Sequence, residues 1–183
     1  PRTGPTRRRA APRANEDEEV NEPSYVSGTS ERPLVYRTIG QALEDVARSY
    51  GEREALIVRH QGVRLTWREL AAEVETFAAG LDALDLAPGE RVGIWAPNRH
   101  EWVVAQLATA RAGLILVTIN PAYRTGELAY ALNKVGCRAL ILAERLKTSD
   151  YLAMLGELAP ELSTAAPGAL ESARLPALRW VIT

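Results

Sequence analysis

Cysteine and histidine are scarce in this chain, and their scarcity excludes several kinds of site. The 183 residues include one cysteine, Cys137, and two histidines, His60 and His100. An internal disulfide needs two cysteines, and structural zinc sites use four Cys or His ligands at regular spacing, so we expect neither. Cys137 follows a glycine at the start of an apolar stretch, which favours a buried core residue over a nucleophile. No motif pairs either histidine with a nucleophile and an orienting acid as catalysis would require, so we expect both to be structural or exposed.

The chain also lacks the clustered glycines of a phosphate-binding loop. Its 13 glycines are scattered, and no GxGxxG, GxxxxGK or run of Ser, Thr and Gly occurs. Such loops need closely spaced glycines, because successive backbone N–H groups must converge on phosphate oxygens without interference from Cβ atoms. A G-x-S-x-G nucleophile elbow is absent too. The sequence therefore predicts no catalytic, cofactor-binding or metal-binding residue in this chain.

Neither an excess of positive charge nor a long apolar run is present. Lys and Arg number 22 against 23 Asp and Glu, a net charge of −1, whereas nucleic-acid binding needs a clustered cationic excess. No apolar run approaches the roughly 20 residues that span a bilayer. We expect no nucleic-acid partner and no transmembrane segment. The single cysteine fits a reducing compartment, and we expect a cytoplasmic location.

The first 23 residues differ in composition from the rest. Five arginines precede residue 14, and an acidic run follows at residues 16–19. This stretch has no apolar periodicity, which predicts a disordered tail over residues 1–23. A mitochondrial targeting segment is the alternative, although the acidic run and the lack of an apolar helical face speak against it.

Capping residues and periodicity predict a helix, a hairpin and a second helix after the tail. Thr38 with Gln41 and Thr66 with Glu69 are two capping boxes, each followed by apolar residues at helical spacing. Between the two helices lie short β-branched runs that suit an antiparallel hairpin, residues 55–59 and 63–66.

Apolar strands then alternate with amphipathic helices. The expected strands are residues 91–95, 114–119 and 138–142, and the expected helices are residues 101–112 and 126–135, each followed by a glycine, Gly113 and Gly136. This βαβαβ order predicts an α/β fold with a doubly wound parallel sheet. A helix at about residues 149–158, a connector at 160–176 and a last strand at 178–183 follow.

Four segments, in their order and spacing, carry a resemblance to a known family. They are SYVSG at residues 24–28, TIGQALEDVA at 38–47, LTWREL at 65–70 and INPAYRTGELAYALNKVGCRALI at 119–141. The chain resembles the AMP-forming acyl-CoA synthetases, more closely their medium- and long-chain fatty-acyl-CoA ligase branch, over residues 24–183. The resemblance implies that residues 24–183 are the amino-terminal part of an incomplete large domain, truncated before the phosphate loop.

The resemblance also implies a reaction. Intact members use Mg-ATP to convert a fatty acid to an acyl-adenylate and pyrophosphate, and then transfer the acyl group to CoA. We expect this chain alone to bind no ATP, Mg²⁺ or CoA and to be inactive. One alternative is a non-catalytic α/β module that binds a partner, for which the missing remainder of the enzyme is a candidate. Another is an unrelated nucleotide-binding domain on the same scaffold, against which the absent glycine fingerprint argues.

The candidate crevice residues follow from the expected sheet. Ligands of open α/β sheets bind beyond the carboxyl ends of the strands, which selects Asn98 after one strand and Asn120, Tyr123 and Arg124 after the next. In a structural interpretation, Asn120 and Tyr123 organise the turn through side-chain hydrogen bonds. In a functional one, Tyr123 or Arg124 borders the acyl or CoA route of the intact enzyme. Trp95, at the end of a strand, is a weaker candidate for ligand contact.

Overall fold

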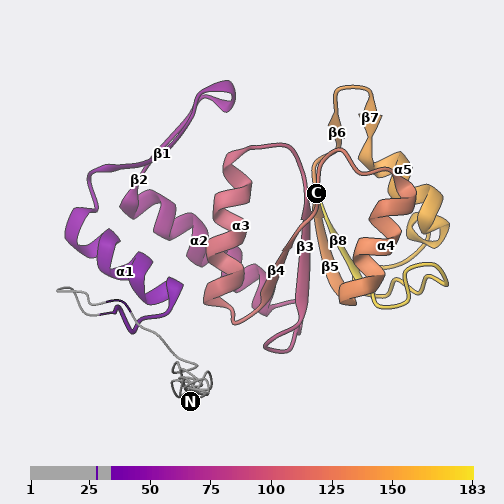
Figure 1. Ribbon diagram of the computed structural model, residues 1–183, viewed down its shortest axis with the longest axis horizontal. Coiled ribbons are helices and arrows are strands. Elements are labelled where there is room, and N and C mark those ends of the chain that lie inside the picture. The colour runs from indigo at the N-terminus through magenta and orange to yellow at the C-terminus, as the bar shows by residue number, and fades with distance from the viewer. Residues whose placement is uncertain (1–27, 29–33) are drawn as a thin grey trace, which may run out of the picture. The chain divides into compact units, whose positions relative to one another are not determined.

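The computed structural model describes Gly28 and residues 34–183, so the predicted tail over residues 1–23 lies outside the described residues. The chain divides into two compact units, residues 1–35 and 36–183, and the second holds all the helices and strands of the described residues. Figure 1 shows them in chain order: α1 (Ile39–Tyr50), β1 (Glu54–Val58), β2 (Val63–Thr66), α2 (Trp67–Asp82), β3 (Arg91–Trp95), α3 (His100–Arg111), β4 (Ile115–Thr118), α4 (Thr125–Val135), β5 (Cys137–Leu142), β6 (Arg145–Leu146), β7 (Ser149–Asp150), α5 (Tyr151–Leu158) and β8 (Trp180–Ile182).

Both predicted capping boxes are present. The backbone N–H of Gln41 donates to Thr38 Oγ1 at 3.2 Å, and the Gln41 side chain accepts from the Thr38 N–H at 3.0 Å, which begins α1. Thr66 and Glu69 repeat the arrangement at α2, at 3.3 and 2.8 Å. Each box satisfies backbone donors that a helix start leaves without partners, and so fixes where the helix begins.

The predicted hairpin joins these two helices. β1 and β2 pair antiparallel, and a single 3-10 turn, Arg59–Gln61, connects them through Gly62. Gly62 has φ +68°, a left-handed conformation that glycine adopts without steric cost. The turn places Gln61 next to the start of α3.

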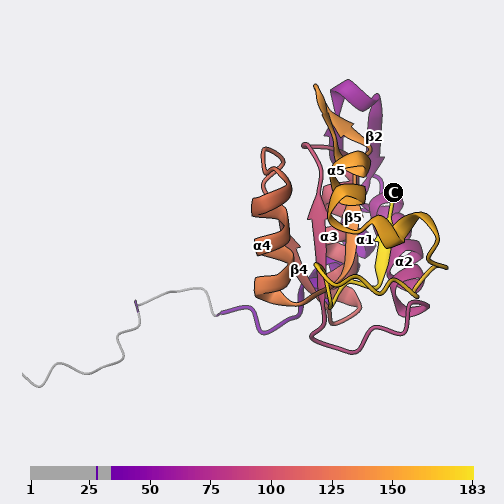
Figure 2. The same ribbon diagram turned by 90° about the vertical axis from the view of Figure 1, so that its right-hand side faces the viewer.

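Four parallel strands form the central sheet in the order β4-β3-β5-β8, which confirms the predicted doubly wound α/β fold. The step from β3 to β4 runs in one direction across the sheet and the step from β4 to β5 in the other. Because crossovers are right-handed, α3 and α4 lie on opposite faces. Helices α1 and α2 pack with α3, and α5 packs with α4 (Figures 1 and 2).

The core lies between these layers. Large side chains with less than 2% exposure come from α2, β3, α4, β5 and α5: Leu81, Ile94, Leu128, Leu140 and Leu155. Cys137 is 1% exposed at the start of β5, which confirms it as a core residue. The three-residue strand β8 is an edge strand of the described sheet and pairs with β5.

One local feature differs from the prediction, and a second goes beyond it. The helix expected from residue 149 begins at Tyr151, because Ser149 and Asp150 pair with Arg145–Leu146 in a small hairpin, β6–β7. Asp150 caps α5 by accepting from the Ala153 N–H at 2.9 Å. The expected connector over residues 160–176 contributes to the core, since Leu170 and Leu175 are each 1% exposed. Turn propensity in a Pro- and Gly-containing stretch does not reveal which of its leucines are buried.

Candidate functional site

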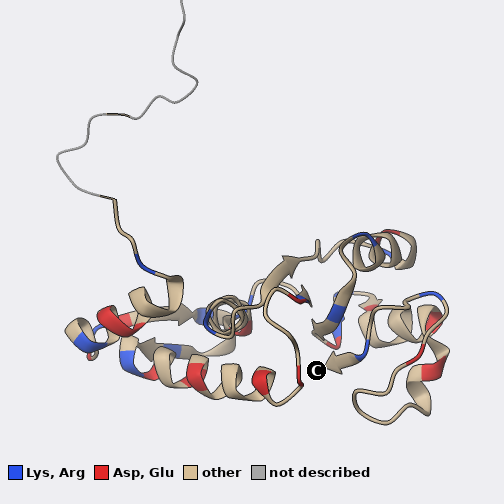
Figure 3. Ribbon diagram, turned by 90° about the horizontal axis from the view of Figure 1, so that it is seen from below, with Lys and Arg blue, Asp and Glu red and all other residues tan. Residues whose placement is uncertain are grey.

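The switch between β3 and β5 defines the candidate site. The connections from these neighbouring strands lead to opposite faces of the sheet, and such a switch leaves a crevice at the carboxyl ends. A groove of about 1020 Å³ opens there, between α2, the start of α3 and the ends of β5 and β8. In Figure 3 α3 is seen end-on beside α2, whose acidic residues recur along the helix.

Most of the groove is apolar. Leu81 is buried, Phe77 is half-buried and Leu84 follows α2. Sheet residues complete the floor: Ile94, Ile141, Leu142 and Ile182. Such a surface binds chiefly by excluding water from apolar groups.

A polar cluster closes one end of the groove. Glu101, in the first turn of α3, accepts hydrogen bonds from Arg99 Nε at 2.8 Å and from Gln61 Nε2 at 2.9 Å. Gln61 Oε1 in turn accepts from the backbone N–H of His100 at 2.7 Å. The His100 ring lies 3.0 Å from Glu101 through Nδ1, without the alignment of a hydrogen bond, and 3.9 Å from Glu73. The cluster joins the β1–β2 hairpin to α3.

The ionisation of Glu101 follows from these contacts. Burial by itself would raise the pKa of the carboxyl, but the hydrogen bonds from Arg99 and Gln61 outweigh it and lower the pKa to about 2. The same contact with Glu101, together with the negative charge of Glu144, raises the pKa of Arg99. A carboxylate held ionised by a guanidinium is a poor general acid or base near neutral pH. The cluster therefore holds this carboxylate ionised and fixes the hairpin against α3.

The four predicted crevice residues lie outside the groove lining. Asn98 is exposed in the loop between β3 and α3. Asn120, Tyr123 and Arg124 lie together after β4, where Asn120 Oδ1 accepts from the Ala122 N–H at 2.9 Å. For Asn120, this bond agrees with the interpretation that its side chain organises the turn. Tyr123 is half-buried against the core, and Arg124 Nη1 donates to Ser149 Oγ at 2.9 Å. Their contact with a ligand stays a prediction.

An aromatic stack next to the turn after β4, between Trp95 and Tyr151, was not predicted from the sequence. The Trp95 ring is 0% exposed and stacks on Tyr151 with 3.9 Å between centroids. Trp95 Nε1 donates to the Asn120 carbonyl at 3.2 Å, and the Tyr151 hydroxyl donates to the Pro121 carbonyl at 2.6 Å. The stack holds the turn after β4 in place and leaves Trp95 no surface for a ligand. Burial raises the pKa of Tyr151, so this hydroxyl stays a donor.

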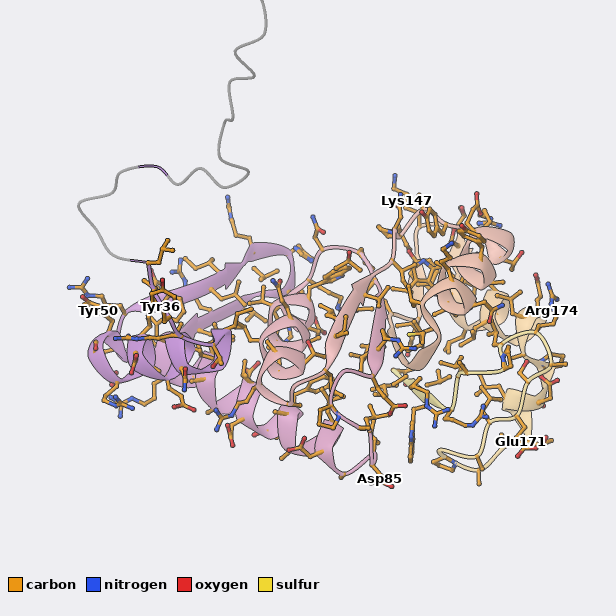
Figure 4. All side chains as sticks on the ribbon, turned by 60° about the horizontal axis from the view of Figure 1, so that its bottom comes forward. Tyr36, Tyr50, Asp85, Lys147, Glu171 and Arg174 are labelled. Carbon is orange, nitrogen blue, oxygen red and sulfur yellow. The ribbon has the colours of Figure 1, made fainter. Side chains whose placement is uncertain are left out.

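The groups present do not fit a magnesium-nucleotide site. No cluster of three His, Cys, Asp or Glu side chains able to hold a metal ion occurs in residues 34–183. Glu101 is committed to Arg99, and burial raises the pKa of the Cys137 thiol to about 11, which keeps it protonated. Lys147 lies at the tip of β6–β7, at the edge of the molecule (Figure 4). In the described part of the chain, no helix is long and apolar enough to cross a membrane.

Comparison with known proteins adds a family match. The AMP-binding enzyme family matches residues 43–177. The human "Medium-chain acyl-CoA ligase ACSF2, mitochondrial" is 49% identical over 160 residues, 87% of this chain and 26% of that protein. The "Putative acyl-CoA synthetase YngI" of Bacillus subtilis is 36% identical over 149 residues, 81% of this chain and 27% of that protein. The chain thus spans about a quarter of the length of these relatives.

A solved structure shares the fold. The N-terminal domain of FACL13 from Mycobacterium tuberculosis superposes with a TM-score of 0.62 at 23% identity, covering 79% of this chain and 33% of that domain. At this identity the likeness supports the fold alone, and it agrees with the α/β architecture described above.

Proposed function

The chain belongs to the AMP-binding enzyme family, and we propose that it supplies the amino-terminal part of the large domain of a fatty-acid CoA ligase. Its relatives include medium-chain acyl-CoA ligases. The observation that carries the proposal is the 49% identity to such a ligase over 87% of the chain. Medium-chain fatty acids are the substrate class that this relationship favours.

The whole enzyme would join a carboxylic acid to CoA in two steps. The carboxylate oxygen attacks the α-phosphorus of ATP and displaces pyrophosphate, which gives an acyl-adenylate. The CoA thiol then attacks the acyl carbon, loses its proton and displaces AMP. In the intact enzyme Mg²⁺ neutralises phosphate charge, but the described residues of this chain do not fit it.

The contribution of residues 36–183 is architectural. The polar cluster of Gln61, Arg99 and Glu101 ties the hairpin to α3 at the carboxyl end of the sheet. The Trp95–Tyr151 stack fixes the turn after β4 at the same end. Together they hold the loops after β3 and β4 rigid, and a reacting geometry needs such rigid support.

A chimera tests the proposed function. Residues 1–183 are fused to the part of human ACSF2 that follows its matched segment, and pyrophosphate release is followed with decanoate, ATP, Mg²⁺ and CoA. We expect decanoate-dependent release and decanoyl-CoA. A folded chimera that converts no fatty acid from hexanoate to palmitate would contradict the proposal. Human ACSF2 itself is the positive control.

The second candidate is a non-catalytic α/β module that binds a partner. It is favoured by the open apolar groove and by the outer edge of β8, which pairs with no strand within residues 34–183. Unpaired strand edges and apolar surfaces are sites where other polypeptides bind. Capture of a defined partner by a chain whose chimera is inactive would favour this candidate.

A cytoplasmic location stays part of the proposal, because a single cysteine fits a reducing compartment. The mammalian relatives carry the word mitochondrial in their names, and the arginine-rich start keeps import as the competing possibility. Cell fractionation with an antibody to residues 36–183 decides between them.

A further inference from the structure

The β1–β2 hairpin contributes little to the core. None of the residues from Glu54 to Thr66 is fully buried, and Ile57 is 46% exposed. Leu56 and Leu65 are only partly buried where they pack against the core. No third strand pairs with the hairpin within residues 34–183. A two-stranded hairpin without further packing is marginally stable, so its position depends on its attachments.

The base of the hairpin is attached through the backbone. The Trp67 N–H donates to the Arg53 carbonyl at 3.0 Å, and the Arg68 N–H donates to the Gly51 carbonyl at 3.1 Å. These bonds join the end of α1 to the start of α2, and both helices contribute buried side chains to the core. The base therefore stays in place if the rest of the hairpin moves.

The tip of the hairpin is attached by one side chain. Gln61 Oε1 accepts from the His100 N–H at 2.7 Å, and Gln61 Nε2 donates to Glu101 Oε2 at 2.9 Å. Within residues 34–183, no other side chain of the hairpin is hydrogen-bonded to α3. In Figure 1 the hairpin extends beside the start of α3. Loss of this one side chain would thus release the tip.

The start of α3 depends on the same side chain. α1, α2 and α5 each begin with a residue whose side chain accepts from a backbone N–H of the first turn, whereas Arg99, at the start of α3, makes no such bond. Gln61 supplies the acceptor for the His100 N–H instead, from 39 residues away. A helix start without an acceptor frays. The hairpin tip and the first turn of α3 therefore stabilise each other.

We propose that the hairpin opens about its base as a unit, that Gln61 holds it closed, and that opening uncaps α3 and leaves Glu101 with Arg99 alone at the end of the groove. Such an opening exposes little of the core and belongs to the low-energy local motions of a folded chain. Glu101 lines the groove, so a ligand group that binds this carboxylate in place of Gln61 favours the open hairpin by linkage. The opening is a property of the chain itself and does not depend on the proposed reaction.

Native-state hydrogen exchange, followed by mass spectrometry on the full 183-residue chain, tests the proposal. Gln61→Ala removes both bonds, and Gln106→Ala, at an exposed position of α3, is the matched control. We expect exchange about tenfold faster for Gln61→Ala in residues 54–66 and in the first turn of α3, because the lost cap and hydrogen bonds correspond to about this factor. Exchange in β3, β5 and α5 should stay at the wild-type rate. Gln106→Ala should leave the hairpin unchanged.

A second variant changes the contact with Glu101 and keeps the cap. Gln61→Glu retains an acceptor for the His100 N–H but places a second carboxylate against Glu101, and like charges at this distance repel. We expect faster exchange in the hairpin for this variant too. Circular dichroism confirms that each variant is folded.

Three outcomes overturn the proposal. The first is wild-type exchange in the hairpin of Gln61→Ala or Gln61→Glu. The second is faster exchange of Gln61→Ala in the hairpin alone, since the start of α3 would then not depend on Gln61. The third is equal acceleration in every element, since the hairpin would then unfold only together with the core.

Discussion

At the residue scale, Glu101 shows how hydrogen bonding can decide the state of a partly buried acid. Burial favours its neutral form, yet contacts with Arg99 and Gln61 lower its pKa to about 2. The hairpin that carries Gln61 was predicted from the sequence, but the link from Gln61 to α3 was not, since it joins residues far apart in the chain. A motif search would pass over this glutamate because none of its partners belongs to a local motif.

The pH dependence of stability tests this state. Because the folded pKa of Glu101 lies below its ordinary value, its stabilising effect is present above about pH 4.5 and is lost as the pH falls toward 2. Solvent screens the contact, since the side chain is 40% exposed, so we expect Glu101→Gln to cost about 1 kcal/mol at pH 7. Urea unfolding between pH 7 and pH 2.5 measures the difference, which should shrink with falling pH. Glu171→Gln, in the connector (Figure 4), is the control. A pH-independent difference would refute the assignment.

Gly93 tests the packing of the sheet. A Cβ at this position would lie 3.1 Å from Cys137 Sγ, from Ile119 and from Leu140. We expect Gly93→Ala to destabilise the chain by about 1–3 kcal/mol through overpacking, with the thermal midpoint lowered by about 2–4 °C for each kcal/mol. Gly80→Ala, at an open helical site, should instead stabilise by about 0.5–1 kcal/mol. If both variants shift the midpoint in the same direction, the packing argument fails.

At the element scale, local signals fixed most of the secondary structure and few of the contacts between elements. Thr38 and Thr66 marked helix starts, and Gly136, at φ +62°, marked a helix end, because capping depends on neighbours in sequence. The β6–β7 hairpin was missed, since its two-residue strands are too short for an alternating pattern. The Trp95–Tyr151 stack was missed because only the folded sheet brings β3 beside α5.

That stack gives an element-scale prediction. Tyr151→Phe keeps the ring and removes the hydrogen bond to the Pro121 carbonyl, so we expect a loss of about 1 kcal/mol. Tyr151→Ala also removes the stack and should cost about 3–5 kcal/mol. Urea unfolding of both variants measures these losses. Tyr130→Phe, at a side chain that is 68% exposed, should change nothing. Equal losses for Phe and Ala would show that the ring contributes little.

At the scale of the whole molecule, the fold forms a crevice at the carboxyl ends of the strands. The groove lies at the switch between β3 and β5, where doubly wound folds bind ligands. Its polar end is a neutralised cluster, and the sequence carries no glycine-rich phosphate loop. Strand order predicted a ligand crevice beyond the carboxyl ends of the strands, and the four residues chosen from it stay a prediction. Those residues lie in the loops that follow β3 and β4. Strand order alone does not show that the groove opens toward β5.

The most direct test of this view is the activity of the purified 183-residue chain alone. The chain is incubated with decanoate, ATP, Mg²⁺ and CoA, and pyrophosphate and decanoyl-CoA are measured beside human ACSF2 under the same conditions. We expect neither product above the enzyme-free control, because the sequence carries no glycine-rich phosphate loop. Sustained, decanoate-dependent pyrophosphate release by the chain alone would contradict an architectural role.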